Sequence, residues 1–101
     1  MNDVTFIGRI AKDIELKKTN GDISVVRFTL AVDRSHKVNN EKVTDFFNIV
    51  AWRGVADNIG KYCKKGDKIC VKGELQNRSY QASDGRTKYV TELNAEKCMF
   101  L

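Results

Sequence analysis

Alternation of apolar and polar side chains along most of the chain is the feature that most constrains its fold. A period of two places successive side chains on opposite faces of an extended strand, one face against a core. In residues 24–33, for example, Val26, Phe28, Leu30 and Val32 share one face. Runs with strand-like patterns predict five strands, at residues 4–10, 24–33, 45–53, 68–80 and 88–101.

Turn residues separate several of these runs. Asn20-Gly21, Asn39-Asn40 and Asp84-Gly85 each fall between strand-like segments. Asn, Asp and Gly tolerate the positive φ that tight hairpins require. The chain has no proline, internal repeat or linker-like stretch, so we expect residues 1–101 to form one domain.

Residues 55–65 have helical spacing instead, with apolar positions that include Val55, Ile59 and Tyr62. Gly66 follows as the expected C-terminal stop of this helix. Gly60 inside it disfavours the helix by about 1 kcal/mol relative to alanine.

The order of elements is therefore three strands, a helix and two strands. This is the order of the OB-fold, an all-β, five-stranded Greek-key barrel, with one α-helix between strands 3 and 4. Other small β-barrels give similar periodicity, so the pattern alone leaves them open.

Composition favours a polyanionic partner. Eighteen Lys and Arg outnumber thirteen Asp and Glu, which gives a net charge of +5. No apolar run is long enough to span a membrane and no secretory signal pattern is present, so we expect a cytoplasmic protein. The cysteines, Cys63, Cys70 and Cys98, lack metal-ligand spacing and suit reduced, buried thiols; we expect no cofactor and no metal.

The strand at residues 45–53 carries aromatic side chains on both faces. If Phe47, Ile49 and Ala51 face the core, then Phe46, Asn48, Val50 and Trp52 face outward. Outward aromatics favour base stacking on a nucleic acid, since a stacked base contributes about 1–3 kcal/mol. The alternative is that Phe46 and Trp52 cover a subunit interface or lie under a loop.

Two further rings are candidates for stacking. Tyr80 lies near the expected tip of a hairpin, where it either folds over a bound strand or forms a cross-strand pair with Tyr89. His36 stacks on a base or is simply an exposed loop residue.

Basic residues on or beside the expected outward faces and hairpins are candidates for phosphate contacts. They are Arg9, Arg27, Arg34, Lys37, Arg53, Lys72, Arg78, Arg86 and Lys88. No nucleophile–base pair or phosphate-binding loop has the required spacing, so an enzyme is the least favoured class. An RNA-binding module and a protein-assembly module remain alternatives to a module that binds single-stranded DNA.

Six stretches together resemble the bacterial single-stranded DNA-binding protein family. They are VTFIGRIAKD from residue 4, FTLAVDR from 28, TDFFNIVAWR from 44, YCKKG from 62, GELQNRSY from 73 and DGRTKYVTE from 84. The resemblance implies an OB-fold that assembles as a homotetramer and binds single-stranded DNA with little sequence preference. The family's stacking aromatics correspond to Phe46, Trp52 and Tyr80, and a fourth position is occupied by His36.

The resemblance also implies a role in replication, recombination, repair or DNA uptake, in association with the nucleoid. Members of the family typically continue into a flexible segment with an acidic tip that recruits replication and repair enzymes. This chain ends at Leu101, so we expect either a specialised short form, as in some phage, mobile-element or competence-related members, or a shortened piece of a longer member; in both cases we expect no tail-mediated partners for these residues.

Overall fold

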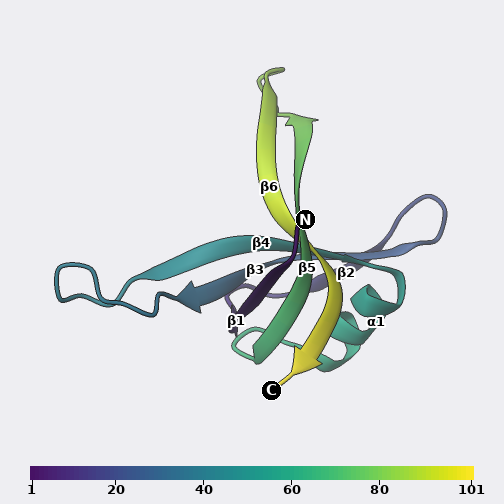
Figure 1. The fold of residues 1–101 in the computed structure, drawn as a ribbon. Helices are drawn as coiled ribbons and strands as arrows, with labels where there is room; N and C mark the ends of the chain where they lie inside the picture. Colours follow the sequence, from purple (N-terminus) through teal and green to yellow (C-terminus); the bar gives the residue numbers. More distant parts are fainter.

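The computed structural model describes all 101 residues as six strands and one helix (Figure 1). The elements are β1 (Val4–Ile10), β2 (Glu15–Lys18), β3 (Ser24–Asp33), β4 (Thr44–Trp52), α1 (Arg53–Tyr62), β5 (Lys68–Gln81) and β6 (Thr87–Phe100). No helix has the length and apolar character needed to span a membrane.

Five of the strands close into a barrel in the order β1-β5-β6-β4-β3, and β1 pairs with β3 to complete the circle. All neighbours are antiparallel except β4 and β6, which run parallel from Asn48 to Val50. The helix lies in the chain between the third and fourth barrel strands. This architecture confirms the predicted OB-fold.

Strand β2 was absent from the sequence prediction. It follows β1 after residues 11–14 and extends the pairing along β3, from Glu15 opposite Arg27 to Lys18 opposite Ser24. All four of its residues are exposed, so the segment has no buried face to produce an apolar alternation.

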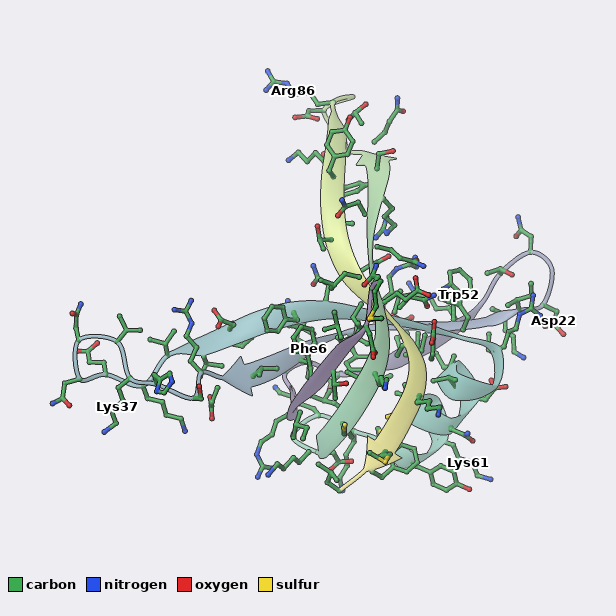
Figure 2. The ribbon with its side chains drawn as sticks, in the orientation of Figure 1. Phe6, Asp22, Lys37, Trp52, Lys61 and Arg86 are labelled. Atoms are coloured by element: carbon green, nitrogen blue, oxygen red, sulfur yellow. The ribbon has the colours of Figure 1, made fainter.

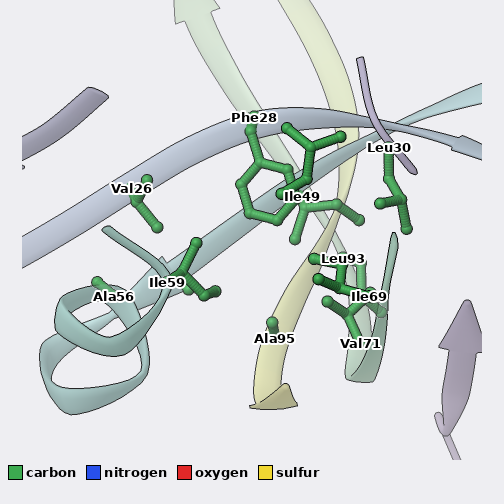
Figure 3. Packing of buried hydrophobic residues seen from close by; sticks show 12 residues of the cluster. Val26, Phe28, Leu30, Ile49, Ala56, Ile59, Ile69, Val71, Leu93 and Ala95 are labelled. Atoms are coloured by element: carbon green, nitrogen blue, oxygen red, sulfur yellow. The ribbon is translucent and has the colours of Figure 1, made fainter. Parts of the chain in front are cut away.

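The core contains the alternating apolar residues that the sequence marked (Figure 3). Val26, Phe28 and Leu30 of β3 and Ile49 of β4 are buried together with Ile59 of α1. The cluster is completed by Ile10, Ala51, Ala56, Ile69, Val71, Leu93 and Ala95. Burial of such side chains, about 1.5–3 kcal/mol for each large one, is what closes the barrel.

The helix begins two residues earlier and ends three residues earlier than predicted. Its C-cap is Cys63, and Gly66 instead occupies a later turn with φ of +93°. Packing explains the glycine at position 60 in the middle of the helix, because a Cβ there would lie 3.2 Å from the side chain of Leu16 on β2. Strand β2 therefore approaches the helix where the helix has no side chain.

Strands β5 and β6 form one long ribbon that leaves the barrel partway along its length (Figure 1). The register shifts between Lys72 and Gly73, as in a β-bulge. A Cβ on Gly73 would collide with the backbone of Asn94 and Ala95, so the two strands approach closely at this bend. Beyond it, residues 74–81 of β5 are all exposed.

Candidate nucleic-acid interface

The outer face of β4 presents two aromatic side chains to solvent. Phe46 is 65% exposed and Trp52 is 37% exposed, whereas Ile49 and Ala51 are fully buried. The predicted placement of Phe46 and Trp52 on one outward face therefore agrees with the alternation in the structure.

Val50 corrects the prediction for this strand, because it is only 2% exposed. It belongs to the outer face by register, directly between Arg27 on β3 and Asn94 on β6. The side chains of directly paired residues lie next to each other on a sheet. The longer Arg and Asn side chains thus flank the valine and shield it from water.

Tyr80 lies on the exposed part of the β5–β6 ribbon, as predicted. It is directly opposite Lys88, while Tyr89 is opposite Ser79. Adjacent positions of a strand point to opposite faces, so Tyr80 and Tyr89 do not form a cross-strand pair. The alternative interpretation of Tyr80 as the partner of Tyr89 was wrong.

A groove of about 310 Å³ runs between the outer face of β3 and β4 and one face of the ribbon. Arg27 and Asn48 line it from the barrel, and Arg78, Tyr80 and Glu92 line it from the ribbon. The remaining lining residues are Lys12, Asp13, Phe28, Thr29, Ile49 and Val90. Donors, acceptors and an aromatic ring therefore meet in one concave site.

Glu92 connects the two sides of this groove. Its side chain is 7% exposed, and Arg78 Nε donates to Glu92 Oε1 at 2.9 Å. The other carboxylate oxygen of Glu92, Oε2, lies 3.6 Å from Arg27 Nε. Sequence reasoning missed Glu92, because a single acid in a mostly exposed strand gives no sign that it is buried between two arginines.

Each of these arginines also lies over an aromatic ring. The guanidinium carbon of Arg27 is 5.8 Å from the centroid of the Trp52 ring, and that of Arg78 is 5.5 Å from the centroid of the Tyr80 ring. Both distances lie within the range of a cation–π contact. The structure thus links Trp52, Arg27, Glu92, Arg78 and Tyr80 in a continuous row, which we call the Arg–Glu–Arg row.

Three other predicted basic residues are held by contacts within the protein. Arg34 forms a two-pronged pair with Asp45, at 2.8 and 3.2 Å, and these hydrogen bonds hold the pKa of the Asp45 carboxyl below its ordinary value. Lys72 lies 3.6 Å from Asp3. Arg9 donates to the carbonyl of Gly66 at 3.1 Å, in a depression that shares no lining residue with the groove.

The remaining predicted residues occupy projecting parts of the molecule. His36 and Lys37 are exposed in the loop between β3 and β4, and Figure 2 shows Lys37 far from Trp52. Arg86 lies at the tip of the ribbon (Figure 2). Lys88 is exposed opposite Tyr80, and the structure does not bring His36 to the groove.

Arg53, also a predicted contact, follows Trp52 as the first residue of α1. Its φ is +57°, in the left-handed region that residues other than glycine seldom adopt. The turn from β4 into α1 is therefore locally strained next to an exposed aromatic side chain.

A second, smaller apolar cavity adjoins Phe46. It has a volume of about 230 Å³ and is lined by Phe6, Phe47, Leu75 and Leu93 among others. The rings of Phe6 and Phe47 stack with centroids 4.2 Å apart. Phe46 and this stacked pair therefore line the same cavity.

The cysteines lie away from the groove and are unoxidised. Cys70 is buried, as predicted, but Cys63 and Cys98 are only partly buried. Burial raises the pKa of the Cys98 thiol to about 12, and the neighbouring thiols of Cys63 and Cys70 add to the shift. No group of three or more His, Cys, Asp or Glu side chains is placed to hold a metal ion.

Residues 1–101 match the single-strand binding protein family along their whole length. The chain is 43% identical over 102 residues to the "Single-stranded DNA-binding protein" of Streptococcus pneumoniae serotype 4, and 44% identical to that of Bacillus cereus. It is 47% identical to "Single-stranded DNA-binding protein 3" of Clostridium acetobutylicum. These alignments include all of this chain but only 65%, 60% and 71% of the respective relatives. The chain therefore spans less than two thirds of the length of the first two relatives.

Proposed function

This chain belongs to the single-strand binding protein family, and from that premise we propose that it binds and protects single-stranded DNA with little sequence preference. Bases stack on Trp52, Tyr80 and Phe46, and basic side chains along the same surface neutralise phosphates. His36 contacts the strand outside the groove, from the β3–β4 loop. The protein acts by binding, without catalysis.

The observation that carries this proposal is the Arg–Glu–Arg row with its two rings. Trp52 and Tyr80 come from different strands, β4 and β5, and each has an arginine over it next to one groove. Bases have an apolar face and stack on aromatic rings or guanidinium planes. Double-stranded DNA hides those faces, so this surface favours unpaired strands.

Trp52 gives a direct test, because it is the only tryptophan. We expect its fluorescence to fall on titration with a thymidine oligomer, with an affinity that decreases as salt rises. An adenosine or mixed oligomer should bind within a few-fold. Equal affinity for duplex DNA would overturn the preference for single strands, and tighter binding to an RNA oligomer would identify RNA as the substrate.

We also propose that the protein functions as a homotetramer in the cytoplasm, associated with the nucleoid, during replication, recombination, repair or DNA uptake. An apolar row on the outer wall of the barrel supports self-association: Ile7, Cys70 and Met99 are paired across β1, β5 and β6. Ile7 and Met99 are exposed. Sedimentation equilibrium should give four times the 11.5 kDa chain mass, and a monomer would contradict this proposal.

A further inference from the structure

The two arginines of the Arg–Glu–Arg row differ from the other basic residues of this surface, because they share one buried acid. Each uses its Nε toward a different oxygen of Glu92. Neither has a hydrogen-bond partner within the protein for its outer Nη groups. The three side chains together carry a net charge of +1.

Glu92 restricts the positions that the two guanidinium groups can adopt. A phosphate that drew Arg78 or Arg27 away would leave a carboxylate that is 7% exposed with only one partner. Loss of a partner by a buried charge is strongly unfavourable. A phosphate that joined without displacing Glu92 would place two anions on one guanidinium. Both arrangements disfavour phosphate contacts by these arginines.

Bases meet no such obstacle. A guanidinium that keeps its Nε on Glu92 still presents a flat face and its Nη donors to a neutral partner. Arg27 and Arg78 already lie beside the rings of Trp52 and Tyr80, where a stacked base would be an immediate neighbour. Arginine planes are established stacking surfaces for unpaired bases.

We therefore propose that Arg27 and Arg78 contact the bases of the bound strand, that Glu92 is the residue that positions them, and that other basic side chains neutralise the phosphates. This inference rests on the proposed function. It divides the basic residues into two classes that are distinguishable in solution. Phosphate contacts release counterions and give binding its salt dependence, whereas base contacts add affinity without it.

Lys88 provides the matched comparison. It lies on the same face of β6 as Val90 and Glu92, directly opposite Tyr80 on the neighbouring strand. It is exposed and has no ion pair within the protein. A lysine in this position is free to approach a phosphate.

The experiment measures thymidine-oligomer affinity by Trp52 fluorescence over a range of salt concentrations for the wild type and three variants. Lys88→Gln removes the free cation. The double variant Arg78→Gln/Glu92→Gln loses one positive and one negative charge, so the row keeps its net charge of +1. Glu92→Gln alone releases both arginines from their acid. Circular dichroism and thermal unfolding establish that each variant is folded.

We expect Lys88→Gln to reduce the slope of log K against log salt by about 0.7, the value for one phosphate contact with a single strand. The double variant should weaken binding by about 5- to 140-fold, the equivalent of one stacked base, and its slope should not fall; it should steepen by at most about 0.7, because only Arg27 is then released from the acid. Glu92→Gln should steepen the slope by about 0.7 for each arginine that turns to a phosphate.

A double variant whose slope falls as much as that of Lys88→Gln would overturn the proposal, since Arg78 would then be a phosphate contact. An unchanged slope in Glu92→Gln would show that the acid restrains nothing. If variants at Glu92 do not fold, Arg78→Gln alone decides the question by the same slope. Absence of binding by the wild type would instead reject the proposed function, so the two failures are distinguishable.

Discussion

The two halves of the β5–β6 ribbon share one hairpin but differ in almost every physical respect. In the barrel half, residues 69–73 of β5 pair with residues 95–100 of β6, and Ile69, Cys70 and Val71 are buried. In the projecting half, residues 74–81 of β5 pair with residues 87–94 of β6, and every residue of that β5 segment is exposed. On β6, Glu92 to Asn94 still pair with β4, and Leu93 lies in the core. The backbone pairing is continuous apart from the bulge at Gly73.

The difference shows how one hairpin serves both stability and binding. A two-stranded ribbon in water is marginally stable by itself. The projecting half is therefore held in place by the barrel half, whose apolar side chains are packed in the core. Side chains of β5 beyond the bend, such as Arg78 and Tyr80, lie outside the core and are available to a ligand.

The largest expected effect is on stability in the barrel half. Ile69→Ala removes a fully buried side chain, so we expect the free energy of unfolding to fall by about 2–5 kcal/mol in urea titrations. Tyr80→Ala, in the projecting half, should change it by less than about 0.5 kcal/mol. Similar losses for the two variants would contradict the division between the halves.

The bend itself should be the next most sensitive position. Gly73→Ala places a methyl group against the backbone of Asn94 and Ala95, and we expect a loss of about 1–3 kcal/mol in the same assay. Gly54→Ala is the matched control, because nothing lies within 4 Å of a Cβ there and alanine favours the helix. A neutral Gly73→Ala would mean that the close approach is not required.

The affinity for DNA, unlike the stability, should depend on the exposed rings of β4 and the projecting half. Trp52→Ala and Tyr80→Ala should each weaken binding of a thymidine oligomer by about 1–3 kcal/mol, measured by fluorescence anisotropy of a labelled strand. Tyr62→Ala is the control, since Tyr62 is an exposed ring on α1 that contacts Phe100 at the base of the barrel. Unfolding by Trp52→Ala, or an equal effect of Tyr62→Ala, would favour a packing role.

The smallest expected effect concerns a thiol of the barrel half, Cys98, opposite Val71. Because burial raises its pKa from 9.0 to about 12, almost none of it is thiolate at pH 8. We expect iodoacetamide to modify it slowly in the folded protein and readily in urea, as measured by mass spectrometry of peptides. Labelling at equal rates in both states would contradict this.

The raised pKa of Cys98 also makes the free energy of unfolding depend on pH. The folded state keeps the Cys98 proton at pH values where the unfolded chain loses it, so this contribution is complete below pH 9 and is lost as pH rises toward 12. Cys98→Ala should remove this part of the pH dependence of the free energy of unfolding.

Local patterns were sufficient where one side of a strand is buried. Val26, Phe28 and Leu30 alternate as predicted, and the turn at Asn39-Asn40 has the positive φ that these residues tolerate. Val50 and strand β2 escaped prediction, because neighbours distant in sequence determine whether those residues are covered or paired. The end of α1 was misplaced because Gly66 serves a later turn and not the helix.

By itself, the sequence determined the order of the five barrel strands along the chain, the place of the helix between the third and the fourth of them, and the outward direction of Phe46 and Trp52, since these follow from periodicity along single segments. Only the tertiary structure decided which cations share a site. Arg27, Arg78 and Glu92 lie on three strands and meet through the closure of the barrel and the bend at Gly73. Their pairing depends on distances across strands, and a pattern along one strand carries no information about such distances.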